Sequence, residues 1–308
     1  MIDPSRRLRL GTRASRLALA QASETAAALE AAHGWPAGTV EVVPMTTTGD
    51  RVQDRSLAAI GGKELWTREL DRALLAGEVD ACVHSMKDVE SERPPELTIA
   101  AMLERADPRD RLIGAGSVDD LGQGAVIGTS SPRRAAQLKR LRPDLVAQVL
   151  RGNVETRLGK LADGEVDATL LAAAGLDRLG LDVGFPVSLD ILLPAPGQAA
   201  IGIECRSDDD AAAALVAAIN HPDTFDCVEA ERAFTRALGG SCASPVAALG
   251  SILAEGVRLR VQILSADGRE LVEDEGRFAR GDGEGPAALA RAMLDRAPAA
   301  VRSLFDAP

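Results

Sequence analysis

Aromatic side chains are scarce in this chain of 308 residues: they make up 2% of it, and tyrosine is absent. Proteins that bind single-stranded nucleic acid stack its bases on aromatic rings, so this scarcity argues against such a role. The net charge of −11 argues in the same direction, because the phosphate backbone attracts basic surfaces. We therefore expect no nucleic-acid partner.

Long apolar runs are also missing. No stretch approaches the roughly 18 apolar residues of a membrane-spanning helix, and residues 1–10 contain no apolar segment of signal-peptide length. The sequence therefore predicts a cytoplasmic protein that has no membrane partner.

Cysteine and histidine are few and widely spaced. The cysteines form no C-x-x-C pair, and in a reducing compartment we expect free thiols at Cys82, Cys205, Cys227 and Cys242. The three histidines make no ligand spacing with these cysteines, which argues against a structural zinc site. We predict no metal.

The chain is organised around residues 81–88, ACVHSMKD, which begin as an apolar run and end in polar groups. A short apolar run bounded by turn residues is typical of a buried strand in an α/β sheet. Ligands of such sheets sit just beyond the carboxyl ends of the strands, where Ser85, Lys87 and Asp88 fall beside His84. The alternative for Asp88 is an ordinary helix N-cap, the default for an isolated aspartate.

Two segments of the first hundred residues recur later in the same order. Residues 125–131 (AVIGTSS) echo 10–15 (LGTRAS), and 161–168 (LADGEVDA) echo 75–81 (LAGEVDA). This repetition predicts two similar α/β lobes, which commonly face each other across a ligand cleft. The polar segment 46–62 is long enough to be a lid or a tether.

The chain changes character after residue 240. Residues 246–253, 257–264 and 269–278 read as three strands, and 287–304 read as one closing helix. The sequence therefore predicts a small α+β domain at the C-terminus.

Arginines gather at the turn positions of both expected lobes, although the protein as a whole is acidic. A guanidinium holds its charge at every relevant pH and binds a carboxylate through two parallel hydrogen bonds. Such a set favours a ligand with several carboxylates; taken singly, each member reads as an ordinary surface arginine. The set is Arg13, Arg133, Arg134, Arg151, Arg157 and Arg178.

Several short motifs occur in a fixed order along the chain. They are HSMKDV at 84–89, GTSSPRR at 128–134, LRGNV at 150–154, TRL at 156–158 and C-x-x-P at 242–245. Four further motifs belong to the same set: GGK at 61–63, PRD at 108–110, AGLxRLG at 174–180 and GIEC at 202–205. Together they closely resemble the porphobilinogen deaminase (hydroxymethylbilane synthase) family, from Leu8 into the third domain.

The resemblance implies an enzyme that joins four porphobilinogen molecules head to tail, releases ammonia at each step and yields hydroxymethylbilane for tetrapyrrole and heme biosynthesis. It implies a dipyrromethane cofactor linked to Cys242 and a catalytic carboxylate at Asp88. The cofactor-binding residues matched by motif are Cys242, Lys87, Ser85, Thr129, Ser131, Arg133, Arg134 and Asp88. The substrate-binding residues are Arg13, Ser15, Gln21, Lys63, Arg151, Arg157 and Arg178.

The resemblance also implies a fold class: α/β, with two periplasmic-binding-protein-like lobes around a cleft and a small α+β C-terminal domain. It places lobe 1 at residues 1–101 with 198–217, lobe 2 at 102–197 and the C-terminal cofactor-carrying domain at 218–308. A monomer is expected.

Five positions depart from the family pattern. Ser241 stands where glycine is usual, Trp66 where phenylalanine is common and Ala199 where glycine is frequent. Arg16 and Glu90 replace frequent prolines. None of these departures removes a group that the chemistry needs, but each leaves a local conformation open.

A second interpretation is a two-lobed anion-binding or effector-sensing module. It accounts for the arginines and for the paired Gly-Thr turns. It does not account for the Lys87-Asp88 pair or for a cysteine in the loop that opens the third domain.

Overall fold

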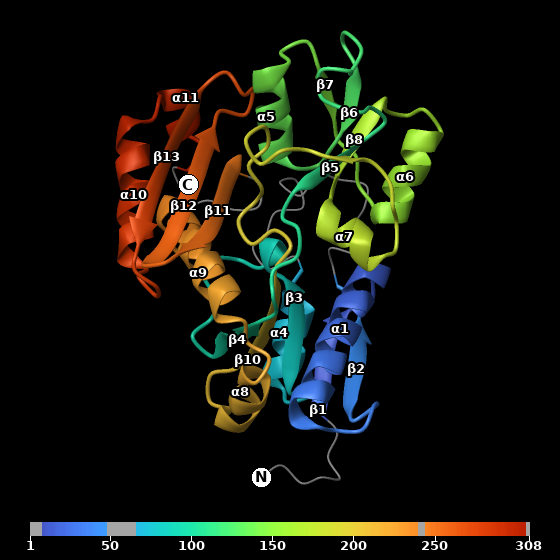
Figure 1. Cartoon of the computed structure of the whole chain (residues 1–308), viewed down its shortest axis with the longest axis vertical. Helices are drawn as coiled ribbons and strands as arrows, with labels where there is room; N and C mark the ends of the chain where they lie inside the picture. Colours follow the sequence, from blue (N-terminus) through green and yellow to red (C-terminus); the bar gives the residue numbers. More distant parts are fainter. Residues whose placement is uncertain (1–7, 48–65, 240–243, 306–308) are drawn as a thin grey trace. The chain divides into compact units, whose positions relative to one another are not determined.

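The computed structural model describes residues 8–47, 66–239 and 244–305, and the chain divides into two compact units (Figure 1). Unit one comprises the described residues up to 106 together with 200–225. Unit two comprises 107–199 and 226–305. Among the described residues, unit one contains one β-sheet and unit two contains two.

The sheet of unit one, sheet A, has the strand order β2-β1-β3-β10-β4. β1, β2 and β3 are parallel, and β10 lies antiparallel between β3 and β4. The bounds of the strands are Leu8–Arg13 for β1, Val40–Met45 for β2, Ala81–Ser85 for β3, Leu97–Met102 for β4 and Ile201–Arg206 for β10.

Helices cover sheet A on both faces, which explains why its central strand β3 is an apolar run that is buried along nearly its whole length. α1 (Arg16–His33) and α8 (Asp210–Ala217) pack on one face and share a core with Leu10, Val83 and Ile203. α4 (Arg68–Leu75) packs on the other face, where its leucines meet Val79 and Cys82.

The first sheet of unit two, sheet B, repeats the topology of sheet A. Its order is β7-β6-β8-β5-β9, with β6, β7 and β8 parallel and β5 antiparallel to β8 and β9. The bounds are Asp110–Ile113 for β5, Val126–Gly128 for β6, Val146–Gln148 for β7, Ala168–Ala172 for β8 and Phe185–Pro186 for β9. Its helices are α5 (Pro132–Leu141), α6 (Val154–Ala162) and α7 (Ala173–Arg178).

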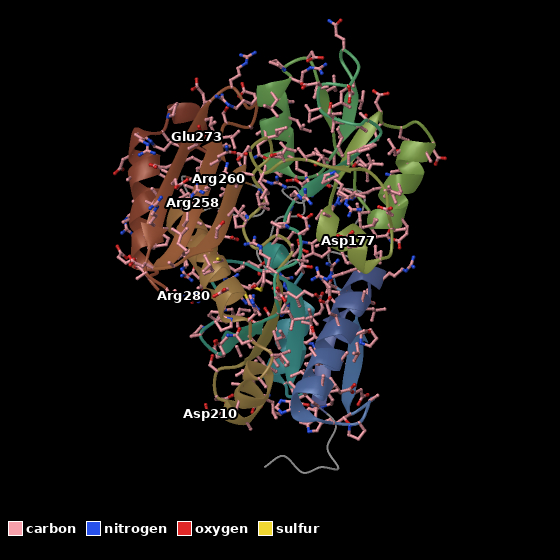
Figure 2. All side chains as sticks on the ribbon, viewed as in Figure 1. Asp177, Asp210, Arg258, Arg260, Glu273 and Arg280 are labelled. Carbon is pink, nitrogen blue, oxygen red and sulfur yellow. The ribbon has the colours of Figure 1, made fainter. Side chains whose placement is uncertain are left out.

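The third sheet is antiparallel, with the order β11-β12-β13. Its strands are Val246–Leu253, Gly256–Leu264 and Leu271–Phe278, and the helices are α9 (Pro222–Leu238), α10 (Glu284–Arg296) and α11 (Ala299–Arg302). One face packs with Phe234, Met293 and Val301 into a core. On the other face, β12 carries Arg258 and Arg260, and β13 carries Glu273 (Figure 2).

Two sequence predictions about the fold have clear outcomes. The fold class is confirmed: the protein is α/β, with two sheet-containing lobes of like strand order and a small α+β C-terminal region. The single closing helix over 287–304 is wrong, because α10 ends at Arg296 and α11 begins at Ala299. Pro298 explains the break: the residue before a proline avoids helical backbone angles, and Ala297 is extended.

β10 belongs to sheet A although it follows the strands of sheet B in the chain. The division of the chain into 1–101 with 198–217, 102–197 and 218–308 remains a proposal. Within the described ranges, no helix has the length and apolar character needed to cross a membrane.

Ala199 is the one residue other than glycine with a positive φ, 73°, within the described ranges. An L-residue with a Cβ is strained in this left-handed region, whereas glycine is not. We expect Ala199→Gly to raise the free energy of unfolding by about 0.5–1 kcal/mol, net of the greater freedom that glycine gives the unfolded chain. Chemical denaturation measures the effect.

Ala200→Gly is the matched control, because Ala200 is also buried (1% exposed, against 8% for Ala199) and is not among the residues of positive φ. It should lower the free energy of unfolding by about 0.5–1 kcal/mol. Equal losses in both variants would contradict the strain assigned to Ala199.

Candidate active site

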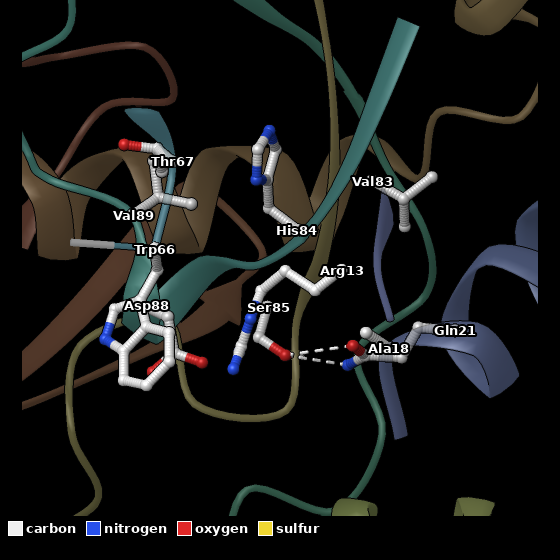
Figure 3. A pocket seen from close by; sticks show the side chains of 10 residues that line it. All are labelled: Arg13, Ala18, Gln21, Trp66, Thr67, Val83, His84, Ser85, Asp88 and Val89. Carbon is white, nitrogen blue, oxygen red and sulfur yellow. Dashed lines mark hydrogen bonds between the residues drawn. The ribbon is translucent and has the colours of Figure 1, made fainter. Parts of the chain in front are cut away.

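A pocket of unit one lies at the carboxyl ends of β1 and β3 (Figure 3). Four residues predicted from the sequence line it: Arg13, Gln21, Ser85 and Asp88. They come from β1, α1, β3 and the turn that follows β3. The pocket therefore brings together one cation, one hydroxyl, one amide and one carboxylate.

Asp88 is the last residue of a 3₁₀ turn, Met86–Asp88, whose N-cap position is Ser85. An Asp88 that capped a helix would precede the helix, so the N-cap interpretation is wrong. The side chain is half-buried and lines the pocket. Within the described ranges no donor is hydrogen-bonded to its carboxylate.

The side chains of Ser85 and Gln21 are hydrogen-bonded to each other at the pocket. Gln21 Nε2 donates to Ser85 Oγ at 2.9 Å, and Ser85 Oγ donates to Gln21 Oε1 at 3.0 Å (Figure 3). Ser15 has a structural contact as well, because its hydroxyl accepts the Ala18 N–H at the start of α1. Lys87 lies in the same turn as Asp88.

Trp66 is a pocket residue that sequence reasoning missed as a site residue. The Arg13 guanidinium lies over its ring, 4.1 Å from the ring centroid, in a cation–π contact. Arg13, Trp66, Ser85 and Asp88 lie close to one another in Figure 3. The sequence feature that could have indicated this role is the tryptophan itself, a larger aromatic ring at a position where phenylalanine is common in the family.

The predicted residues of unit two follow the parallel strands of sheet B. Thr129 and Ser131 follow β6, and Arg151 follows β7. Arg157 lies on α6, and Arg178 ends α7, which begins where β8 ends. Thr129, Ser131 and Arg151 thus follow strand ends, where ligands of an α/β sheet bind, whereas Arg157 and Arg178 lie on helices.

Thr129 and Ser131 also organise their own loop: Thr129 Oγ1 accepts the Ser131 N–H at 3.1 Å, and Ser131 Oγ accepts the Arg134 N–H at the start of α5. Arg157 donates through Nε to the Gly152 carbonyl at 2.9 Å. Lys63 and Cys242 lie outside the described residues.

Arg133 and Arg134 are 3% and 6% exposed, so the interpretation of these two as surface arginines is wrong. Both donate to Asp110, which is 1% exposed: Arg133 Nη2 at 2.9 Å from Oδ2 and Arg134 Nη2 at 2.7 Å from Oδ1. Burial alone would raise the pKa of Asp110, but the two guanidinium groups outweigh it and hold that pKa well below its usual range. Asp110 is a second residue that sequence reasoning left unassigned.

Asp110→Asn should lower the free energy of unfolding by about 3–5 kcal/mol, because it leaves two buried guanidinium groups without their counter-charge. A carboxyl with a depressed folded pKa stabilises the protein above its unfolded pKa of about 3.9 and loses that contribution as pH falls. The difference between wild type and Asp110→Asn should therefore shrink below about pH 4. Denaturation at several pH values measures both effects.

Asp144→Asn is the control, because Asp144 pairs with Arg142 at the surface of the same unit. Exposed pairs contribute little, so the variant should unfold nearly as the wild type does. Equal stability of Asp110→Asn and Asp144→Asn at neutral pH would contradict the account of the buried pair.

The described cysteines are poor nucleophiles. Cys82, Cys205 and Cys227 are buried. Burial raises the pKa of the Cys205 thiol to about 12 and raises that of Cys82 well above its usual value. At neutral pH both remain thiols and not thiolates.

Fold and pocket together define an α/β protein whose pocket presents one guanidinium and one carboxylate at the carboxyl ends of two adjacent parallel strands. Residues 8–214 match the family description "Porphobilinogen deaminase, dipyromethane cofactor binding domain", and residues 225–294 match "Porphobilinogen deaminase, C-terminal domain". Three curated relatives carry the name porphobilinogen deaminase.

The relative from Sphingopyxis alaskensis is 57% identical, over 99% of this chain and 98% of its own length. The relative from Paracoccus denitrificans is 48% identical over 97% of each chain. The relative from Geobacter metallireducens is 47% identical over 87% of this chain and 85% of its own length. The chain belongs to the porphobilinogen deaminase family, so it is an enzyme, and its residues 8–214 correspond to the family's dipyrromethane cofactor binding domain. The alternative of a non-catalytic anion-binding module is therefore wrong.

Proposed function

We propose that the chain condenses four porphobilinogen molecules, head to tail, onto a dipyrromethane primer linked to Cys242, and releases hydroxymethylbilane. One observation carries the proposal beyond the family assignment. Asp88 stands in a pocket with Arg13 and Ser85, beyond the carboxyl ends of two adjacent strands. The pocket thus offers a negative charge for the reacting centre beside groups that bind carboxylates.

Asp88 is proposed as the catalytic carboxylate. Porphobilinogen loses ammonia and becomes an electron-poor azafulvene cation, which a free pyrrole α-carbon then attacks. A carboxylate fixed near the pyrrole N–H groups stabilises that positive charge as it develops, and it can take up the proton that the attacking α-carbon loses once the new C–C bond has formed. The 3₁₀ turn fixes the position of Asp88 relative to the end of β3, as such a role requires.

The donor set fits a cofactor that carries several carboxylates. Arg133 offers a further observation, because its buried Nε has no hydrogen-bond partner among the described residues. A buried donor of this kind is costly unless an acceptor reaches it. When bound, the dipyrromethane supplies the free α-carbon at which the chain grows. Its proposed ligands are Ser85, Lys87, Asp88, Thr129, Ser131, Arg133 and Arg134, with Cys242 as the covalent attachment.

The remaining cations and hydroxyls are proposed to hold the acetate and propionate arms of the substrate. Arg13 and Gln21 support this role by lining the pocket with Asp88. The full proposed set is Arg13, Ser15, Gln21, Lys63, Arg151, Arg157 and Arg178. A guanidinium suits the task because it keeps its charge and forms paired hydrogen bonds.

The protein is further proposed to be a cytoplasmic monomer. The free thiols of Cys82 and Cys205 are in keeping with a reducing compartment.

Incubation of the purified protein with porphobilinogen tests the function. We expect four porphobilinogen molecules consumed and four ammonia molecules released for each hydroxymethylbilane formed. Binding of porphobilinogen without release of ammonia would contradict the proposal.

A further inference from the structure

A buried cluster of charged side chains lies on the α4 side of sheet A, next to the pocket. We call it the Arg93 cluster, and its members are Thr67, Asp71, His84, Glu90, Arg93 and Glu204. Cys82 packs toward α4, and alternate residues of a strand share a face, so His84 projects toward the same side. In Figure 3 the His84 ring accordingly points away from the Ser85 hydroxyl.

Arg93 is the centre of this cluster. Its Nε and Nη2 donate to the two oxygens of Glu204 at 2.8 and 2.9 Å, in a bidentate pair. Nη2 also donates to Asp71 Oδ1 at 2.5 Å, and Nη1 donates to Glu90 Oε2 at 3.3 Å. A planar guanidinium can serve three carboxylates at once, whereas the single nitrogen of a lysine cannot hold the same geometry.

The opposite charges of the cluster keep one another ionised despite their burial. Burial lowers the pKa of Arg93, but Glu204 and Asp71 outweigh burial and the net effect is to raise it, so the guanidinium stays charged. Burial by itself would raise the pKa of Glu204, yet His84 and Arg93 lower it to about 2. Glu204 has no exposed side-chain surface, and the Arg93 guanidinium is its counter-charge.

The cluster is joined to the stretch that carries Asp88. Thr67 and His84, two of its members, line the same pocket as Asp88, and Arg93 follows Asp88 by five residues. His84 Nε2 lies 3.2 Å from Glu204 Oε2 on β10. The stretch is therefore attached to Glu204 on both sides of Asp88.

β10 also supports the turn itself. The Met86 N–H donates to the Ala200 carbonyl at 3.1 Å. The Met86 side chain packs where Gly202 has no Cβ, and a Cβ there would lie 2.1 Å from the methionine sulfur. One strand thus fixes the turn, the histidine before it and the arginine after it.

We infer that Arg93 is a positioning residue, which with Glu204 fixes the segment that carries Asp88 and so sets the place of that carboxylate in the pocket. The inference rests on the proposed catalytic role of Asp88. Arg93 does not line the pocket, so it acts through Asp88 and not by touching substrate. The competing interpretation is a buried ion pair that only stabilises the fold.

Arg93→Lys tests the inference, with Arg9→Lys as the matched control. Arg9 forms a bidentate pair with Asp80 in the same unit, through Nε at 3.2 Å and Nη2 at 2.8 Å, and does not line the pocket. On cofactor-loaded protein, we expect Arg93→Lys to lower kcat about tenfold, because small displacements of catalytic groups slow reactions strongly. Its KM should stay within about twofold of wild type, and Arg9→Lys should leave both constants nearly unchanged.

A double-mutant cycle with Asp88→Glu separates positioning from general damage. A residue that acts through Asp88 loses most of its effect once Asp88 is already displaced. Arg93→Lys should therefore cost less than about twofold in kcat in the Asp88→Glu background. A purely structural defect would lower kcat by the same factor in both backgrounds, and that result would overturn the inference.

Glu90→Gln covers the case in which Arg93→Lys fails to fold or to load cofactor. It removes one charge from the cluster at a side chain that is 21% exposed, and Glu78→Gln is its surface control. We expect a fall of about threefold in kcat with KM unchanged; equal kcat in the two glutamine variants would overturn the inference. An inactive wild type would instead refute the proposed function, so the two failures are distinct.

Discussion

Asp88→Asn should lower the turnover of porphobilinogen by about 10²–10³, the typical loss when one preorganised electrostatic partner is removed. The amide keeps the size and most of the hydrogen bonding of the carboxylate but loses the negative charge that opposes the azafulvene cation. The 3₁₀ turn that carries Asp88 has its N-cap at Ser85, so the substitution removes no helix cap. The loss should therefore appear in kcat at unchanged thermal stability.

Asp88→Glu is the informative companion variant. It keeps the charge but displaces it, so it should retain more activity than Asp88→Asn. Steady-state kinetics of both should be compared at equal cofactor occupancy, determined by intact mass. If Asp88→Asn carries cofactor and turns over at close to the wild-type rate, Asp88 is not the catalytic carboxylate.

The local part of the site could be predicted from sequence. Strands β3 and β6 are apolar runs that end in polar turns, and this pattern marks the ends at which Asp88 and Ser131 lie. The placement needs only the rule that ligands meet strand ends. The repeated strings also predicted two lobes, and the matching strand orders of sheets A and B bear that out.

The long-range part of the site could not be predicted in this way. β10 inserts antiparallel between β3 and β4 after more than ninety intervening residues, and no local pattern specifies such a pairing. Arg93 and Glu204 are 111 positions apart, so neither charge reveals its partner in the sequence. The burial of Arg133 and Arg134 depends in the same way on Asp110, which lies 23 and 24 positions away.

Three departures from the family pattern have visible local consequences. Glu90, which replaces a frequent proline, accepts hydrogen bonds from Thr67 Oγ1 at 3.2 Å and Arg93 Nη1 at 3.3 Å. Trp66 supplies the ring beneath Arg13. Ala199 keeps the left-handed backbone that glycine would adopt without strain. In each case the local conformation depends on contacts that the sequence alone does not show.

Cys242→Ser should abolish cofactor attachment and reduce activity to background. A serine hydroxyl is a far weaker nucleophile than a thiolate, so it should form no stable link to the pyrrole chain. Cys227→Ser is the matched control: its thiol is buried, at 5% exposure, and the variant should still carry the cofactor. Loss of cofactor from Cys227→Ser but not from Cys242→Ser would reverse the assignment.

Mass spectrometry of the unmodified protein tests the central claim most directly. The intact mass should exceed that of the sequence by two linked pyrrole units, and peptide mapping should place the adduct on the fragment that contains Cys242. A protein of sequence mass, or an adduct on Cys82, Cys205 or Cys227, would contradict the account.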